Sequence, residues 1–497
     1  MAHHHQVGVH ACCLLRVCLD GKLRLSSRLL RGVHGVLGIV LRWFGHATCV
    51  DDPGVRRNRP AAAHTQARPL TALRPASTLT VDRGETDVPT SSPARAAAAG
   101  GPGVPRSDVY VQRFSLPFEY PVYFTRDALD PMNRALREAL TRLERGRRHR
   151  VFPIVDRGLW SECPGLGARL EDYASHHRDA IELVAPPELV SGGERVKNNP
   201  DLVGALQRRF YETGIDRQSF VLILGGGAIQ DMAGFAAATT PRGLRVIRMP
   251  STVASQNDSG VGVKNGINAF DVKNFVGAFA PPFAVINDLA FIDTLSDRDR
   301  RAGISEAVKV ALLRDSGFFS WLVASSADLA GFDPEAMALM IRRSAELHLE
   351  HIGGGGDPFE FGSAKPLDFG HWAAHKLESL TGYRLRHGEA VAIGIALDCR
   401  YAVEKGLLGA HVLDQVCELL EDLGLELWHD VLGERDATGR LWILDGLAEF
   451  REHLGGELTV TMITDPGRPL DVHEIDEASM EKALDWLHRR HASIRAR

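Results

Sequence analysis

The sequence predicts an α/β domain with a Rossmann-like parallel sheet, followed by an α-helical domain. Short apolar strands alternate with helical segments from about residue 149 to residue 252, which is typical of a parallel sheet with crossover helices. After about Leu295 the pattern becomes helical and stays so. We therefore expect an α/β domain over residues 108–295 and a helical domain over residues 296–497, with a ligand site between them.

The amino-terminal stretch, residues 1–107, differs in composition from the rest. It is rich in Ala, Pro, Arg, Ser and Thr, which bury little apolar surface, so we expect a disordered extension or a segment upstream of the true start. It carries 14 Lys and Arg against 6 Asp and Glu, a net charge of +8. The remaining residues carry 44 basic and 57 acidic groups, and this acidic body argues against nucleic acid as a partner.

Cysteine usage and hydropathy bear on the cellular setting. The seven cysteines show no spacing typical of a disulfide framework or a zinc knuckle, which favours a reducing, cytoplasmic location. No uncharged apolar run reaches about 18 residues, so we expect no membrane span. The apolar stretch 32–43 is short and lies behind several Arg, which argues against a signal peptide.

The individual elements follow from hydrophobic periodicity and from helix stop signals. We expect strands at residues 109–124, 149–156, 180–187, 219–225 and 244–252, and a short strand at 457–463. We expect helices at residues 130–145, 201–213, 228–239, 301–313, 334–351, 370–380, 388–405, 412–423 and 480–490.

A glycine-rich turn, Gly225-Gly226-Gly227, follows an apolar strand and opens a helix. Glycines let the backbone approach a pyrophosphate, and the helix start offers N–H donors. The pattern is not GxGxxG, so an ordinary tight turn fits equally well. Asp156 ends an earlier strand, where its carboxylate can accept ribose hydroxyls or cap a helix. The loop 192–197 offers an acid and a base near the same sheet edge, although such loops are more often solvated.

Histidines and a glutamate form a second constellation: Glu306, His371 and His387. His375 follows His371 by four residues on an expected helix, so the two share a face. Two imidazoles and a carboxylate would suit a catalytic divalent metal with an open position for substrate. A histidine pair at this spacing is also common as a purely structural pair.

The polar segment 255–274 forms a third constellation. Lys264 and Lys273, with Asn268 and Asn274, would make a cradle for phosphate and hydroxyl groups. The alternative is a long surface loop. An apolar run follows the segment at once, so we expect it to be pinned to the core.

Taken together, these residues resemble the dehydroquinate synthase superfamily, the sugar phosphate cyclases. The resemblance rests on GGGAIQDMAGFAAAT, DSGVGVKNGIN, KNFVGAF, AGISEAVKVALL and HGEAVAIGI. It is continuous over residues 222–313, resumes over 357–396 and extends more weakly from residue 149 to the carboxyl terminus. It implies a dehydroquinate synthase-like fold, a homodimer, and NAD and Zn²⁺ (or Co²⁺) as cofactors.

The resemblance also assigns roles to single residues. The metal ligands implied are Glu306, His371 and His387. The NAD contacts implied are Asp156, Glu194, Lys197, Gly226, Gly227, Asp231, Ser251, Thr252, Thr294 and Leu295. The positions for substrate phosphate, hydroxyls and charge are Arg242, Lys264, Lys273, Asn274, His375, Asp258 and Lys309. His453 lies near a position where the family carries Lys.

In this family NAD is recycled during the reaction. A substrate hydroxyl is oxidised, phosphate leaves by β-elimination, hydride returns, the ring opens, and an intramolecular aldol step closes a carbocycle. The metal polarises the forming carbonyl. The substrate's own phosphate can take the proton, and we expect His375 to relay protons near it.

The chain departs from dehydroquinate synthase where that enzyme binds the substrate carboxylate. The family's Arg and the Asn four residues later are replaced by Ala364 and Asp368, and Glu350 lies nearest to the position of a family Lys. Ala cannot form the bidentate Arg–carboxylate contact, and Asp368 would repel a carboxylate while accepting hydroxyls. Lys365 could replace the lost Arg by moving one place, which keeps dehydroquinate synthase open.

These departures predict a neutral polyol end on the substrate. Among the cyclases that indicates sedoheptulose 7-phosphate, giving a valiolone-type cyclitol, and FGHWAAH is similar to the 2-epi-valiolone synthase-like branch. A net NAD-dependent polyol or glycerol-phosphate dehydrogenase shares the fold, the NAD site and the metal, and is the main alternative from another class. A non-catalytic binding protein would have lost a metal ligand.

Overall fold

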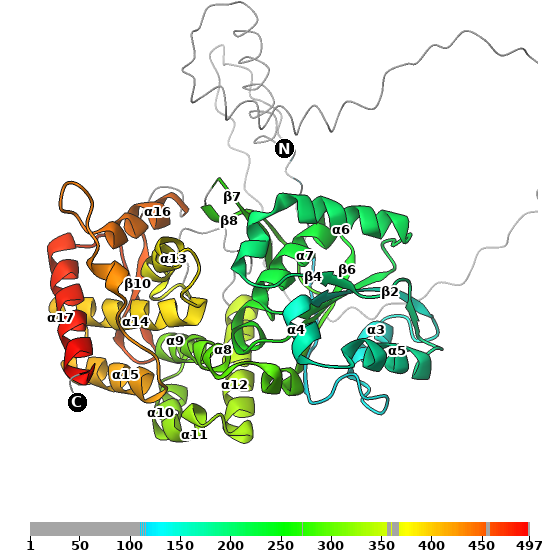
Figure 1. Ribbon diagram of the computed structural model, residues 1–497, viewed down its shortest axis with the longest axis horizontal. Helices are drawn as coiled ribbons and strands as arrows, with labels where there is room; N and C mark the ends of the chain where they lie inside the picture. Colours follow the sequence, from blue (N-terminus) through cyan, green and yellow to red (C-terminus); the bar gives the residue numbers. More distant parts are fainter. Residues whose placement is uncertain are drawn as a thin grey trace, which may run out of the picture. The chain divides into compact units, whose positions relative to one another are not determined.

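The computed structural model describes residues 116–270, 272–354, 367–453 and 458–495, together with residues 110, 112, 114 and 359. Val109–Arg497 forms one compact unit, shown in Figure 1. The extension expected over residues 1–107 lies outside the described residues. Because Val109–Arg497 forms one compact unit, the expected boundary between two domains after residue 295 stays a prediction.

A parallel sheet forms the centre of the α/β part, as predicted. Its strands are β1 (Val122–Thr125), β2 (His149–Asp156), β3 (Ile181–Leu183), β4 (Glu188–Val190), β5 (Phe220–Gly225), β6 (Arg245–Pro250) and β9 (Ala284–Asp288). Within the described residues this seven-stranded sheet has the order β1-β9-β6-β5-β2-β3, with β4 also paired to β2. All pairings are parallel, so Asp156, Gly225, Pro250 and Asp288 end their strands at one edge.

Helices cover both faces of the sheet (Figure 1). They are α3 (Ala135–Thr141), α4 (Arg157–Glu162), α5 (Leu166–His176), α6 (Pro200–Glu212) and α7 (Gly227–Thr239). Alternate residues of β5 enter two separate cores. Leu222 packs on the face covered by α3 and α5, whereas Val221 and Ile223 pack against α6 and α7. This two-sided burial explains the nearly continuous apolar run of the strand.

Two expected elements near the start of the body are shorter than predicted. Among the described residues of the strand expected over 109–124, only Val122–Phe124 pair, as part of β1 beside β9. The described aromatic residues before it, such as Phe114 and Phe118, are exposed rather than packed in a sheet. Of the helix expected over 130–145, only α3 forms. The chain turns at Asn133 before the helix begins, and the Asn133 side chain accepts a hydrogen bond from the Ala135 N–H (3.0 Å).

The polar segment 255–274 is a π-helical turn (Ser255–Ser259) and an antiparallel hairpin, β7 (Lys264–Ala269) with β8 (Val272–Phe279). The hairpin is held to the sheet by Arg248, which is fully buried in β6. Its guanidinium donates to the carbonyl oxygens of Gly262 (2.9 Å) and Lys264 (3.1 Å). The expectation that the segment is pinned to the core is therefore confirmed, and its hairpin form was not foreseen.

Helices dominate after residue 295, as predicted. They are α8 (Asp297–Ala302), α9 (Ile304–Arg314), α10 (Ser316–Ala324), α11 (Ser326–Ala330), α12 (Pro334–Gly354), α13 (His371–Leu380), α14 (His387–Glu404), α15 (Ala410–Asp422), α16 (Asp445–His453) and α17 (Glu477–Arg495). Short 3-10 helices lie at Asp430–Gly433 and Trp442–Leu444, and another, Leu289–Thr294, precedes α8. A second hairpin, β10 (Val460–Asp465) with β11 (Arg468–Val472), overlaps the strand expected at 457–463 from Val460 onward.

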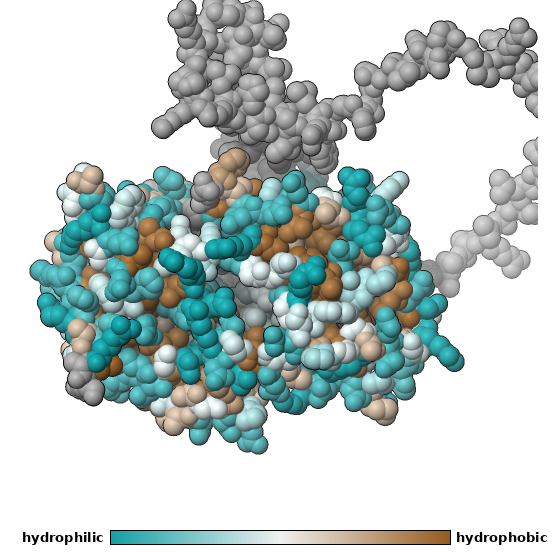
Figure 2. All heavy atoms as spheres, in the orientation of Figure 1, coloured by the Kyte–Doolittle hydropathy of each residue, from teal (hydrophilic) through white to brown (hydrophobic). Residues whose placement is uncertain are grey.

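One face of this body can be followed in a space-filling view (Figure 2). The face drawn in Figure 2 carries mainly hydrophilic residues, with hydrophobic ones in separate groups. Among the described helices, none has both the length and the apolar character that crossing a bilayer requires.

Helix α14 is the centre of the helical part, and it touches α13 through glycines. A Cβ on Gly394 would lie 2.0 Å from the carbonyl oxygen of Gly370, the residue that precedes α13. Gly370 has a φ of +75°, which also favours glycine. The two helix backbones can therefore approach closely only because both positions lack a side chain.

Asp398 of α14 fixes the start of α13. Its buried carboxylate accepts hydrogen bonds from the Gly370 N–H (3.0 Å) and the Trp372 indole N–H (2.8 Å). Burial raises the pKa of Asp398 to about 7, although these two hydrogen bonds act in the opposite direction. The same contacts orient His371, which lies between the two donors.

We expect Gly394→Ala to destabilise the protein by about 3 kcal/mol or more, because the new methyl group would collide with backbone that cannot rotate away. Denaturant unfolding measures this free energy. Gly204→Ala in α6 is the matched control, since nothing lies within 4 Å of its Cβ position and Ala favours a helix by about 0.5–1 kcal/mol. Equal stability of the two variants would contradict the close approach.

We expect one aspartate carboxyl signal to titrate near pH 7 in a ¹³C NMR titration of the wild type. That signal should be absent from the titration of Asp398→Asn. The folded state keeps this proton up to about pH 7, whereas the unfolded state releases it near 3.8. The contribution of Asp398 to the free energy of unfolding therefore falls as pH rises across that window. A wild-type minus variant stability difference that stays flat over this window would refute the assignment.

Candidate active site

The carboxyl edge of the sheet brings together several residues predicted to contact NAD. Asp156 ends β2, and its carboxylate accepts a hydrogen bond from the Gly158 N–H (2.7 Å). A Cβ on Gly192 would lie 2.3 Å from an oxygen of Asp156, so the loop 192–197 crosses this edge closely. A Cβ on Gly226 would lie 3.2 Å from the Thr252 methyl group. The turn therefore leaves an open backbone at the start of α7, which suits a pyrophosphate.

Other predicted NAD residues lie along the same edge. Ser251 follows β6 and donates its backbone N–H to the Gly225 carbonyl (3.0 Å). Thr294 and Leu295 follow β9 at the end of a 3-10 helix. The sequence-based set is thus gathered at one edge, as expected for strands that run parallel.

Lys197 forms a buried charge pair beside this edge. Its side chain is 2% exposed, and its Nζ lies 2.8 Å from Asp231 of α7 and 3.6 Å from Glu194. It also donates to the side-chain oxygen of Asn274 in the hairpin. Burial lowers the pKa of Lys197, but Asp231 and Glu194 outweigh burial and raise it. This lysine therefore stays charged and joins the NAD edge to the hairpin.

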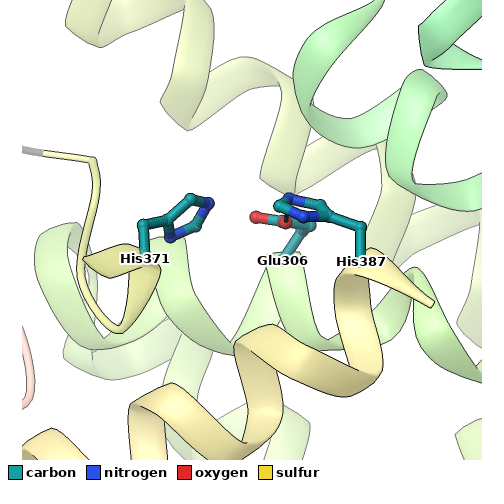
Figure 3. A group of neighbouring side chains, drawn as sticks. All are labelled: Glu306, His371 and His387. Carbon is teal, nitrogen blue, oxygen red and sulfur yellow. Dashed lines mark ion pairs between the residues drawn. The ribbon is translucent and has the colours of Figure 1, made fainter. Parts of the chain in front are cut away.

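Glu306, His371 and His387 come together in the helical part (Figure 3). Glu306 lies on α9, while the histidines are the first residues of α13 and α14. Their potential ligand atoms lie within 4.8 Å of one another, and both rings are turned toward the carboxylate. His371 Nδ1 lies 3.0 Å from the Phe369 carbonyl, which leaves its Nε2 with a lone pair for a metal.

A second group could in principle hold a metal: His375, Glu378 and His387. It shares His387 with the first group. However, the carboxylate of Glu378 already contacts the ammonium of Lys273 at 2.8 and 3.1 Å. A cation at that carboxylate would have to displace the ammonium, so the first group fits a divalent ion better.

Lys309 and Asp258 lie next to the predicted metal ligands, as the sequence indicated. Lys309 Nζ is 2.7 Å from Glu306 and 3.8 Å from Asp258. Burial raises the pKa of Glu306, but Lys309, with the neighbouring histidines, outweighs burial and lowers the pKa to about 2. Asp368 also lies near enough to raise the pKa of Lys309.

His348 of α12 was missed by the sequence analysis. Its Nδ1 lies 2.9 Å from the Asp258 carboxylate, inside the site. Glu350, which we placed nearest to the family Lys, instead pairs with Arg343 at 3.4 Å and is exposed. His348 and Glu350 are two residues apart on α12, so their side chains point to different faces of the helix.

His375 also lies in the site. Its ring centroid is 5.4 Å from that of His371 and 6.0 Å from that of His387. Burial, with the positive charge of Lys273, holds the pKa of His375 well below its usual value. It is therefore neutral at neutral pH.

Some predicted residues are not brought into this cluster. Arg242 lies exposed in the turn before β6, at the amino-terminal end of the strand and so on the opposite side of the sheet from Gly226. The side chain of Lys264 is exposed at the start of β7. Ala364, Lys365 and the side chain of His453 lie outside the described residues.

Comparison with known proteins gives a consistent match. The family described as 3-dehydroquinate synthase N-terminal matches residues 188–302, and 3-dehydroquinate synthase C-terminal matches residues 303–442. A 3-dehydroquinate synthase of Paracoccus denitrificans (strain Pd 1222) is 37% identical over 305 residues, 61% of this chain and 82% of that protein. One from Rhodopseudomonas palustris (strain BisA53) is 32% identical over 383 residues, covering 75% and 93%.

A solved structure extends the comparison to the fold. The 2-epi-5-epi-valiolone synthase from Streptomyces hygroscopicus subsp. jinggangensis 5008, solved with NAD⁺ and Zn²⁺ bound, is 26% identical. The match covers 77% of this chain and 100% of that chain, with a TM-score of 0.68. The sheet, the helical part and the family matches together show that the chain belongs to the dehydroquinate synthase superfamily, the sugar phosphate cyclases.

Proposed function

We propose that this protein converts sedoheptulose 7-phosphate, a C7 sugar phosphate, to a valiolone-type cyclitol with loss of phosphate. The observation that carries the choice of substrate is Asp368. Its carboxylate lies near Lys309 and the metal-site cluster, where the sequence comparison with dehydroquinate synthase expects an amide. A carboxylate there accepts substrate hydroxyls and repels a substrate carboxylate.

NAD is proposed to bind at the carboxyl edge of the sheet, where it would accept and return a hydride. The open backbone at Gly226 would face the pyrophosphate, and Asp156 the ribose hydroxyls. The fit rests on this structure's own geometry, since a side chain at Gly192 or Gly226 would fill the space beside the edge. The valiolone synthase solved with NAD⁺ supports the same assignment.

A divalent ion, Zn²⁺ or Co²⁺, is proposed to bind Glu306, His371 and His387, where it would polarise the hydroxyl that is oxidised. The donor set of two imidazoles and one carboxylate fits such an ion. Both imidazoles have an oxygen acceptor at Nδ1, which directs Nε2 toward the shared centre.

The remaining side chains would bind substrate and move protons. Lys309, Asp258 and His348 would hold hydroxyl groups beside the metal ligands. Neutral His375 can take up and pass on a proton near the leaving phosphate. The substrate's phosphate can itself remove the proton that the new ketone acidifies, so β-elimination needs no separate protein base.

A second candidate is 3-dehydroquinate synthase itself, because the sequence relatives at 37% and 32% identity carry that name. That reaction requires a cation to bind the substrate carboxylate, whereas Asp368 places a negative charge there, which would repel the substrate carboxylate. The homodimer and the cytoplasmic location expected from the sequence stay predictions.

We expect the purified protein, with NAD and Zn²⁺ or Co²⁺, to release phosphate from sedoheptulose 7-phosphate without accumulating NADH. The keto acid phosphate used by dehydroquinate synthase should release little. Turnover of the keto acid alone would replace our substrate assignment with dehydroquinate synthase. Accumulating NADH would indicate a net dehydrogenase instead.

Within this assay, Asp368→Asn and His348→Ala should each lower kcat/KM for the sugar phosphate at least about tenfold, the loss expected for one charge-assisted hydrogen bond. Glu350→Gln is the matched control, since its carboxylate is exposed and pairs with Arg343. Equal loss in the control would show that these effects are not specific to the site.

Metal content separates the two possible ligand groups. We expect His371→Ala to lose stoichiometric Zn²⁺ and His375→Ala to keep it, because Lys273 already occupies Glu378 in the second group. Elemental analysis of the purified variants measures this. The reverse pattern would assign the metal to His375, Glu378 and His387.

A further inference from the structure

Glu378 is a buried carboxylate to which the sequence assigned no role. It lies on α13, and its side chain is 3% exposed. Two groups contact its carboxylate, an ammonium and an imidazole. The ammonium of Lys273 lies 2.8 and 3.1 Å from its oxygens, and His387 Nδ1 lies 3.0 Å from Oε2.

We propose that Glu378 is a positioning residue that holds the imidazole of His387 for metal binding and ties it to the hairpin through Lys273. This inference rests on the proposed metal site at Glu306, His371 and His387. It adds a residue that acts through one of those ligands without being a ligand itself.

The tautomer of His387 explains why a carboxylate is needed. Its Nε2 faces Glu306 at 3.1 Å, so metal binding requires the lone pair there and the proton on Nδ1. Glu378 accepts that Nδ1 proton. The other histidine, His371, uses only the Phe369 carbonyl for the same purpose. A carboxylate is the stronger acceptor, and it makes the ring a better donor to a metal.

Lys273 explains how this carboxylate can be buried. An isolated buried carboxylate is costly, and the ammonium at 2.8 Å compensates its charge. Lys273 belongs to β8, so the pair joins the hairpin to α13, and His387 carries the contact on to the first turn of α14. The same lysine lies 3.8 Å from Glu194, which in turn lies 3.6 Å from Lys197.

This arrangement links the two binding sites. A shift of the hairpin moves Lys273, and Glu378 transmits that shift to His387. The proposed NAD edge contacts the same hairpin through Lys197 and Asn274. Binding of NAD and of the metal should therefore be coupled, each raising the affinity for the other by the same factor.

The test measures Zn²⁺ affinity of the full-length, metal-stripped protein by competition with a chromogenic chelator, with and without NAD. We expect Glu378→Gln to weaken Zn²⁺ binding about 10- to 100-fold, the usual cost of losing such an outer partner. The effect of NAD on Zn²⁺ affinity should also shrink toward none. The visible spectrum of the Co²⁺ form should change, since the orientation of His387 changes.

Glu449→Gln is the matched control. Glu449 of α16 lies 2.6 Å from Lys376 of α13, the helix that carries Glu378, but it is exposed and is not paired with any predicted metal ligand. Its Zn²⁺ affinity should equal that of the wild type. If Glu378→Gln alone is poorly folded, the double variant Glu378→Gln/Lys273→Met removes both charges together, and it should fold yet still bind Zn²⁺ weakly.

Wild-type Zn²⁺ affinity and NAD coupling in Glu378→Gln would overturn this inference and leave the metal site standing. Wild-type affinity in a well-folded double variant would overturn it in the same way. Failure of the wild-type protein to bind Zn²⁺ or Co²⁺ at all would instead overturn the proposed metal site, and this inference with it.

Discussion

The pairing of buried charges is the constraint on which this site depends. A buried ion is costly unless an opposite charge or hydrogen bonds compensate it, and here oppositely charged pairs are joined end to end. The chain alternates in sign along Asp231, Lys197, Glu194, Lys273, Glu378, His387, Glu306, Lys309 and Asp258. Each lysine lies between two carboxylates, so no member can move or change charge without affecting its neighbours.

The backbone is built to hold this chain in place. Both predicted histidine ligands are the first residues of helices, where the positive end of the helix dipole favours a neutral imidazole. At His387, the carboxylates of Glu378 and Glu306 instead favour the protonated imidazole, and they raise its pKa to about 9 in spite of burial. The separation of the two helix starts depends on Gly370 meeting Gly394, and their orientation on Asp398. Packing between α13 and α14 therefore sets how the two predicted histidine ligands are placed relative to each other.

The sequence predicted the features that follow from local pattern. Alternating strands and helices gave the parallel sheet, and strand direction placed Asp156 and Gly226 at one edge. The metal group followed from a family resemblance, not from spacing. His348 and the hairpin were missed, because which face a helical residue presents and which strands pair depend on distant parts of the chain. Glu378 had a signal that was overlooked, since it lies seven residues after His371 and three after His375 on one helix face.

The balance of charge in the chain bears on the substrate. Five carboxylates alternate with three lysines, so with neutral histidines the described chain is short of two positive charges. A divalent ion at Glu306, His371 and His387 supplies both. The chain then has no positive surplus with which to hold a second anionic group beside Lys309, and Asp368 adds a negative charge there. A substrate whose only anionic group is its phosphate meets this requirement, whereas a keto acid phosphate would bring a carboxylate into a site already neutralised.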